Sequence, residues 1–229
     1  MKLLHFYVRI VAGDGQMFEQ ISNDPYILDI YEDIKSNIDP NGHAIHSLDH
    51  IHNVVSLVEK FLKLLEFDES TIERAKIAAF LHDIGMKYGK ENHAQKSYEI
   101  AREYFVDKMI NTGNNDEVLT AIKHHSEGLE DDIVTSALML ADKLDVKYSR
   151  VTNLGKRVHG IRQYYYIHNV VVMINSTSLK IMFLVDEKAN KKELEDYYFT
   201  AKIFRAVNQF AKVINRLPVV YYNDEIWTL

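Results

Sequence analysis

Residues 77–85 read IAAFLHDIG, an apolar run that ends in two adjacent ionisable residues, His82 and Asp83. The run is typical of a helix buried in a core, and Gly85 and Gly89 predict where that helix ends. Burying a charge without compensation is costly, so the pair is expected to have a partner. Imidazole and carboxylate together are suitable ligands for a divalent metal. The alternative is a solvated helix end, which is the more common environment of an isolated His-Asp pair.

The histidines of the chain are concentrated around this run. Eight of the 11 lie in less than half of the sequence: His43, His46, His50, His52, His82, His93, His124 and His125. Histidines that served only as occasional polar core residues would be more scattered. Three further ligand-type residues lie on predicted apolar helices or at their ends, namely His50, His93 and Asp142. This grouping favours a shared metal site.

Apolar spacing predicts a mainly α fold. Helical spacing recurs at residues 26–34 within the first region, 18–37, and further predicted helices cover residues 48–66, 71–83, 93–109, 116–125, 133–148 and 191–215, the last closed by Pro218. β-branched and aromatic residues gather at 164–167, 170–174 and 179–185, with a turn at 175–178. These segments predict a small β-hairpin, and the tail from 219 to 229 is expected to be extended.

The same pattern divides the chain into three parts. Residues 1–40 are expected to form an N-terminal helical segment and residues 41–155 a metal-binding helical core. Residues 156–229 are expected to add a C-terminal β-hairpin and a long helix to that core. The expected architecture is therefore a helical bundle with a small C-terminal β-hairpin and long helix, within the size range of one domain.

Composition excludes several classes of protein. The net charge of −6 at pH 7 argues against a protein that coats nucleic acid, although a bound metal ion would still admit a nucleotide. The chain has no cysteine, so His, Asp or Glu must hold any metal. No apolar run reaches the roughly 18 residues of a membrane span, and residues 1–11 lack a signal-peptide cleavage site. We expect a cytoplasmic protein that binds neither membranes nor nucleic acid.

The order and spacing of four residues resemble a known signature. His50, then His82-Asp83, then Asp142 are similar to the H…HD…D motif of the HD-domain metal-dependent phosphohydrolases. The flanking segments AAFLHDIG at 78–85 and LADKLD at 140–145 also resemble that family, over roughly residues 41–150. The resemblance implies an enzyme that hydrolyses a phosphate ester or phosphoanhydride of a small molecule, most simply a nucleotide.

The resemblance also implies a set of metal ligands. By it, His50, His82, Asp83 and Asp142 bind one divalent ion (Mn, Fe, Ni, Co or Zn, with Mg as a further candidate), and Asp83 bridges to a second. The second ion would use His93 together with His124, His125 or both. His125 matches better by register, and His124 stays open because some members use a double histidine. The alternative for this pair is a solvated helix end.

His46 and three basic residues are further candidates. His46 resembles the proton donor of related cyclic-nucleotide phosphodiesterases. The alternative is that His46 only caps the helix or binds water. Lys87, Lys143 and Arg150 are candidates for binding substrate phosphate, as is Lys90, with ordinary surface charge as the alternative for each. The remaining histidines are expected to be structural or at the surface: His5, His43, His52, His159 and His168.

Two other functions are compatible with the sequence. The first is a non-catalytic ligand- or protein-binding module on an HD scaffold, and the second is a di-iron oxygenase. The Gly-Tyr-Pro element of cyclic-di-GMP phosphodiesterases is missing after His125, and so is the Glu-Asp pair of alarmone hydrolases after Asp83. The tyrosines of the C-terminal segment would suit self-association into a homo-oligomer, or simply the packing of the last helix.

Overall fold

The computed structural model describes residues 16–37, 42–126 and 131–229, so the prediction for residues 1–11 lies outside the described part. The α-helices are α1 (Gln16–Ser22), α2 (Pro25–Ser36), α3 (Leu48–Leu64), α4 (Glu69–Leu81), α5 (His93–Asp107), α6 (Asn115–His124), α7 (Ile133–Leu144), α8 (Lys191–Asp196) and α9 (Tyr198–Val213). Short 3₁₀ helices are η1 (Ile84–Tyr88), η2 (Tyr148–Arg150), η3 (Gly155–Arg157) and η4 (Ile161–Tyr166). The strands are β1 (Ile167–Ile174), β2 (Ser178–Val185), β3 (Leu217–Tyr222) and β4 (Glu225–Ile226).

Several helices begin where the sequence provides a capping side chain. The carboxylates of Asp24, Asp68 and Asp132 each accept a hydrogen bond from a backbone N–H in the first turn that follows. Asn114 does the same at the start of α6. These bonds satisfy amide groups that have no partner inside the helix, which is why the helices start at these residues.

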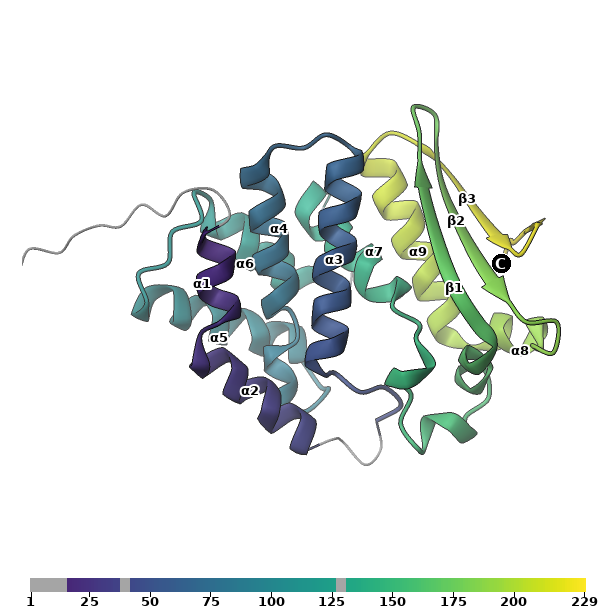
Figure 1. The fold of residues 1–229 in the computed structure, drawn as a ribbon, viewed down its shortest axis with the longest axis horizontal. Helices are drawn as coiled ribbons and strands as arrows, with labels where there is room; N and C mark the ends of the chain where they lie inside the picture. Colours follow the sequence, from purple (N-terminus) through teal and green to yellow (C-terminus); the bar gives the residue numbers. More distant parts are fainter. Residues whose placement is uncertain (1–15, 38–41, 127–130) are drawn as a thin grey trace, which may run out of the picture.

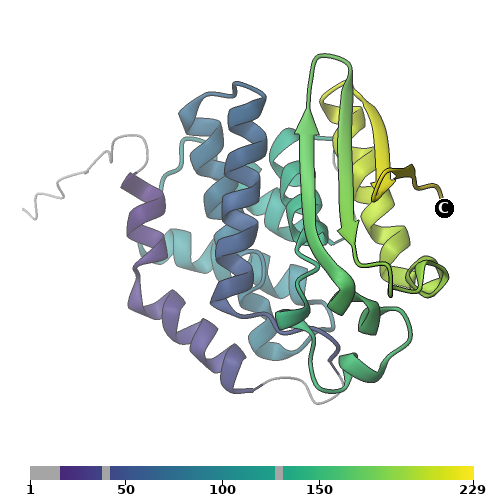
Figure 2. The same ribbon diagram turned by 45° about the vertical axis from the view of Figure 1, so that its right-hand side comes forward.

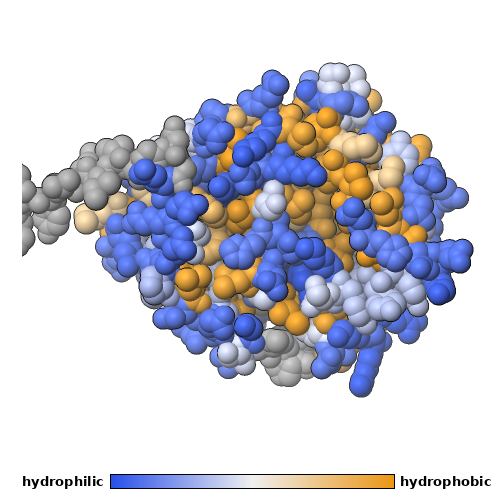
Figure 3. All heavy atoms as spheres, viewed as in Figure 1, coloured by the Kyte–Doolittle hydropathy of each residue, from blue (hydrophilic) through white to orange (hydrophobic). Residues whose placement is uncertain are grey.

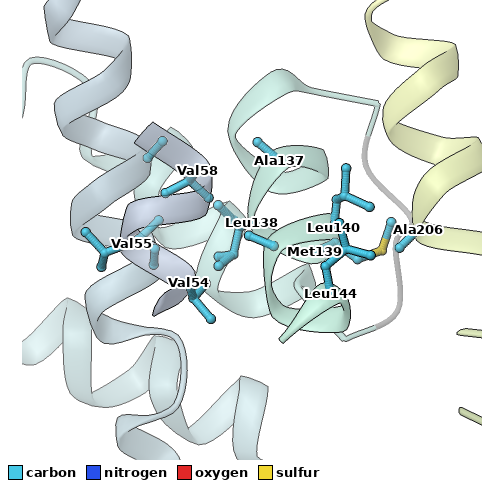
Figure 4. Close-up of a cluster of buried hydrophobic side chains, with 14 of the residues drawn as sticks. Val54, Val55, Val58, Ala137, Leu138, Met139, Leu140, Leu144 and Ala206 are labelled. Atoms are coloured by element: carbon cyan, nitrogen blue, oxygen red, sulfur yellow. The ribbon is translucent and has the colours of Figure 1, made fainter. Parts of the chain in front are cut away.

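Helix α7 lies at the centre of the helical part. Every residue from Val134 to Leu144 is buried, including the polar ones. Apolar side chains of α7 pack against Val54, Val55 and Val58 of α3 on one side and meet Ala206 of α9 on the other (Figure 4). A ligand-type side chain on α7 is therefore held inside the molecule, between two layers of helix.

The strands form one sheet beside the helices, in the order β1-β2-β3-β4 (Figures 1 and 2). β1 and β2 pair antiparallel, which confirms the predicted hairpin. β3 pairs parallel to β2, with α8 and α9 as the connection between them, and β4 pairs antiparallel to β3. The expected extended tail is thus part of a four-stranded sheet.

Three predicted boundaries are wrong, each for a local reason. Residues 164–166 belong to η4 and not to a strand, because Gly160 turns the chain at φ 85° before it. The helix predicted over 191–215 breaks at Tyr197, whose backbone is extended and whose Cβ approaches Gly160. α7 ends at Leu144, four residues early, because Asp145 leaves the helical region and its side chain bonds elsewhere.

The molecular surface in the same view is mostly hydrophilic, with hydrophobic residues gathered towards β1 and β2 (Figure 3). Among the described residues, no helix combines the length and the apolar character that crossing a membrane requires.

Candidate metal centre

Six ligand-type residues converge at the ends of helices. His50 lies in the first turn of α3, His82-Asp83 follows α4, and Asp142 lies in the last turn of α7. His93 begins α5, and His125 follows α6. His50, His82, Asp83 and His125 are at most 1% exposed. The structure therefore brings together residues that are up to 92 positions apart in the sequence.

Asp83 lies at the centre of the cluster, and its two oxygens face different histidines. Oδ2 lies 3.3 Å from Nε2 of His82 and 3.5 Å from Nε2 of His50. Oδ1 lies 3.6 Å from Nε2 of His93 and 3.9 Å from Nε2 of His125. The carboxylate thus lies between two sets of donors, as a bridging ligand must.

Hydrogen bonds to the backbone fix the tautomers of three histidines. Nδ1 of His82, His125 and His93 donates to the carbonyl three residues earlier, at 2.7, 2.7 and 2.9 Å respectively. For His82 and His125 this carbonyl lies in the last turn of a helix, where carbonyl groups lack an intrahelical partner. When Nδ1 carries the proton of a neutral imidazole, Nε2 has a free lone pair. All three Nε2 atoms face Asp83, and those of His93 and His125 also lie 3.2 Å from each other.

A carboxylate fixes the tautomer of His50 in the same way. Its Nδ1 hydrogen-bonds Oδ2 of Asp145 at 2.8 Å. Asp145 is held in turn by Arg150, whose Nη1 donates to the Asp145 carbonyl at 2.7 Å. Sequence reasoning gave Asp145 no role, although it lies three residues after Asp142 in the segment LADKLD.

The donor atoms fit a divalent metal. Nε2 of His50 and Nε2 of His82 are buried and have no hydrogen-bond partner among the described residues. Both face Oδ1 of Asp142, at 3.3 and 3.9 Å. Three sets of residues have donor atoms within 4.8 Å of one another: His46, His50 and Asp83; His50, His82 and Asp142; and His82, Asp83 and His125. Bare imidazole nitrogens beside carboxylate oxygens are the donors that divalent transition metals take.

The acidic residues of the cluster are ionised. Burial raises the pKa of Asp83, but the neighbouring His82 and His46 outweigh it and hold the pKa well below its usual value. Burial also raises the pKa of Asp142, and the ammonium group of Lys143 outweighs it in the same way. Both carboxylates are therefore available as anionic ligands at neutral pH.

The histidines of the cluster differ in basicity. Burial and Arg150 lower the pKa of His50, but the neighbouring carboxylates of Asp142, Asp145 and Asp83 raise it to about 9. Burial and the proximity of His82 lower the pKa of His125 to about 3. His125 is therefore neutral at pH 7, while His50 must lose a proton before its Nε2 can bind a cation.

Gly85 allows α5 to come close enough to place His93. A Cβ on this residue would lie 2.3 Å from the carbonyl oxygen of His93 and 2.4 Å from the backbone nitrogen of Ser97. The N–H of Gly85 donates to Oγ of Ser97 at 2.8 Å. Only glycine fits between η1 and the first turn of α5, so the glycine that follows His82-Asp83 also sets the position of His93.

His46 has a geometry that fits two roles. Its Nδ1 lies 2.5 Å from Oδ2 of Asp83, and its side chain is 19% exposed at the wall of a cavity. This contact leaves Nε2 for another partner, as a proton donor requires. His46 also belongs to one of the three candidate metal sets, so it is equally placed as a ligand.

The two adjacent histidines after α6 are not equivalent. His125 is buried among the cluster, whereas His124 is part of none of the three candidate sets among the described residues. The geometry agrees with the register argument for His125. His52 is exposed, as expected, and its ring lies 6.1 Å from that of Phe80.

A cavity of about 280 Å³ opens beside the cluster, and the predicted phosphate-binding residues Lys87, Lys143 and Arg150 all line it. Lys87 forms an ion pair with Asp33 at 3.0 Å. Lys143 is buried and contacts the carboxylate of Asp142. The structure thus places all three basic residues at one cavity, but each already has a polar partner.

Sequence reasoning missed the other side of this cavity. Residues 197–199 and Lys202, at the start of α9, also line it. No local signal could have placed them there, because their position depends on how the C-terminal part packs against α7.

The six converging residues lie in a region that matches a known family model. Residues 45–147 match the family model of the HD domain. Among solved structures, the chain is similar to a predicted HD superfamily hydrolase from an uncultured Thermotogales bacterium. The two share 22% sequence identity over 61% of this chain and 83% of the other, with a TM-score of 0.43. No curated protein matches the chain.

Proposed function

We propose that the chain hydrolyses a phosphate ester or phosphoanhydride of a small molecule, a nucleotide in the first instance, because residues 45–147 match the family model of the HD domain. The observation that carries the proposal is the convergence of bare Nε2 atoms on Asp83 and Asp142, with each imidazole fixed through its Nδ1. Such a donor set binds one or two divalent transition metal ions.

A divalent ion bound there would supply an activated water and neutralise charge on the phosphate oxygens. The residues of the chain would orient the substrate around it. Lys143 and Arg150, on the cavity wall, would hold phosphate oxygens, with Lys87 at the rim. His46 would protonate the leaving oxygen through Nε2, while Asp83 holds its Nδ1.

The test is metal content together with phosphate release. The purified protein is analysed for metal and then screened against nucleotides and simple phosphate esters with Mn, Fe, Co, Ni, Zn or Mg added. His82→Ala and Asp83→Ala should lose metal and activity together, because each removes a buried donor. His52→Ala is the matched control, since His52 is exposed and belongs to none of the candidate sets among the described residues.

A wild-type protein that stays metal-free and inactive with every added ion would contradict the proposal. That result would favour the non-catalytic binding module. Activity that requires oxygen, and disappears with redox-silent Mg or Zn, would favour an oxygenase instead.

A further inference from the structure

The cavity beside the metal centre has two walls of different origin. One wall comes from the HD domain, with Lys90 and Lys143 among its residues. The other comes from the first turns of α9, with Tyr198 and Lys202, which lie outside the matched region. α9 packs along α7, as Figure 2 shows, so its N-terminal end lies at the same level as the end of α7 that carries Asp142.

The charge of the cavity is opposite to that of the chain. The chain has a net charge of −6, yet the lining includes three carboxylates and six basic side chains: Lys87, Lys90, Lys143, Lys147, Arg150 and Lys202. The three carboxylates, Asp83, Asp142 and Asp145, are engaged with the clustered histidines. A divalent ion among them would make the cavity still more positive. Such a cavity favours a ligand with several negative charges.

Among the described residues, the ammonium groups of Lys90 and Lys202 have neither an acidic partner nor a hydrogen-bond acceptor, whereas Lys147 donates to the amide oxygen of Asn53. Lys202 is half-buried, and the contact found for its ammonium group is with the ring of Tyr198, 5.3 Å from the centroid. Lys90 is exposed on the opposite wall. Burial and the positive charge of Lys143, with a smaller contribution from Lys90, lower the pKa of Lys202. Lys90 and Lys202 thus place two ammonium groups without a counter-ion among the described residues at the two walls of the cavity, an arrangement that favours an anion.

Aromatic side chains accompany these lysines. Tyr198 is 50% exposed, and its ring lies 4.8 Å from that of Tyr197, while Phe199 also lines the cavity. On the neighbouring η4, Tyr164 lines the cavity, and its buried hydroxyl has no hydrogen-bond partner among the described residues. A buried hydroxyl without a partner is destabilising. A ligand oxygen at this wall would satisfy it.

We propose that the start of α9 forms a recognition subsite for a nucleotide with two or more phosphate groups. Lys202 and Lys90 bind the phosphates that lie away from the metal centre, and Tyr198 contacts the base. The identification of these phosphates as part of a substrate rests on the proposed function, but their binding does not.

The test measures equilibrium binding and not turnover. The probes are a methylene-bridged nucleoside triphosphate analogue, the corresponding nucleoside monophosphate, and inorganic tripolyphosphate, titrated calorimetrically into the purified protein. Lys202→Gln should weaken binding of the triphosphate analogue by roughly tenfold and leave the monophosphate nearly unchanged, because one charge-assisted contact is lost. Lys202→Arg should retain most of the affinity. Tyr198→Leu should weaken the nucleotide analogue but not tripolyphosphate.

Lys212→Gln is the matched control, since Lys212 lies on the same helix and pairs with Asp131, outside the residues that line the cavity. If wild type binds none of the probes, or if Lys202→Gln affects mono- and triphosphate equally, the subsite does not exist as proposed. Binding that depends on Lys202 in a protein without hydrolase activity would contradict the proposed function and support the subsite. Hydrolase activity that does not depend on Lys202 would support the proposed function and contradict the subsite.

Discussion

Asp145 fixes the orientation of His50: its Oδ2 lies 2.8 Å from Nδ1 of the imidazole, and both side chains are buried. The opposite nitrogen, Nε2, therefore points at Asp83 and Asp142. Asp145 contributes no atom to the three candidate metal sets, so its effect on a metal must pass through His50. Residues in such a position orient ligands and raise their basicity.

We expect Asp145→Asn to weaken metal binding by about 10- to 100-fold without removing a ligand. An amide loses the charge that stabilises the orientation and basicity of His50. Isothermal titration with Mn or Zn measures the affinity, and a thermal melt checks the fold. Asp131→Asn is the control, because Asp131 is exposed and its partners among the described residues, Gln209 and Lys212, lie on α9. An unchanged affinity in Asp145→Asn would mean that packing alone orients His50.

Metal affinity should rise with pH. Burial and Arg150 lower the pKa of His50, but the neighbouring carboxylates outweigh them and raise it to about 9 in the metal-free protein. Below that pH, a proton must leave before the nitrogen can bind a cation, so the apparent affinity should increase by up to about tenfold per pH unit. Titrations between pH 6.5 and 8.5, in buffers of different ionisation enthalpy, measure both the slope and the proton released. A flat profile with no proton release contradicts this expectation.

The adjacent histidines after α6 provide a matched pair of variants. His125→Ala removes a buried nitrogen 3.9 Å from Asp83, and the metal content should fall by about one equivalent per chain. His124→Ala should keep its full metal content, because His124 is part of none of the candidate sets among the described residues. Elemental analysis after gel filtration makes the comparison. Loss of metal in His124→Ala alone would reverse the assignment.

Glu193 should make the protein sensitive to acid. The carboxylate is 3% exposed and accepts hydrogen bonds from Arg162, Gln163 and the N–H of Gly160, at 2.6–2.9 Å. The bond from Arg162 is the largest influence that lowers its pKa, from 4.5 to about 2. The stabilisation is therefore complete above the unfolded-state pKa and is lost as the pH falls towards about 2.

Glu193→Gln should lower the free energy of unfolding by about 2–3 kcal/mol at pH 7 and flatten its dependence on pH below 5. Urea unfolding at several pH values measures both effects. The exposed Glu187→Gln should change stability by less than about 0.5 kcal/mol. Equal acid sensitivity in wild type and Glu193→Gln would assign the effect to other carboxylates.

The helical core could be predicted from the sequence because its signals are local. Apolar spacing, the capping residue Asp68 and the run before His82 lie within one or two helices each. The candidate ligands could be predicted for a related reason, because an ionisable residue such as Asp142 interrupts an otherwise apolar helix.

The C-terminal part could be predicted only roughly, because its structure depends on contacts between distant residues. The break at Tyr197 has no local cause, since the surrounding sequence is typical of a continuous helix; it follows from the close approach of Gly160. The parallel pairing of β3 with β2, and the position of Lys202 at the cavity, depend on the same packing. A residue such as Lys202 cannot be assigned to a site before its neighbours in space are known.

The single tryptophan of the chain gives this packing a spectroscopic signal. The ring of Trp227 is 4% exposed and lies between Phe183 of β2, Phe204 of α9 and Tyr222 of β3. Its indole emission reports the docking of the final strands onto α9, whose first turns border the cavity. Local release of that segment would expose the indole to water and shift its emission to the red before the helices melt. Tryptophan fluorescence follows the packing of the C-terminal part, and far-ultraviolet circular dichroism follows the loss of helix. Measured through one unfolding curve, the two signals therefore distinguish the stability of that packing from the stability of the histidine-bearing core.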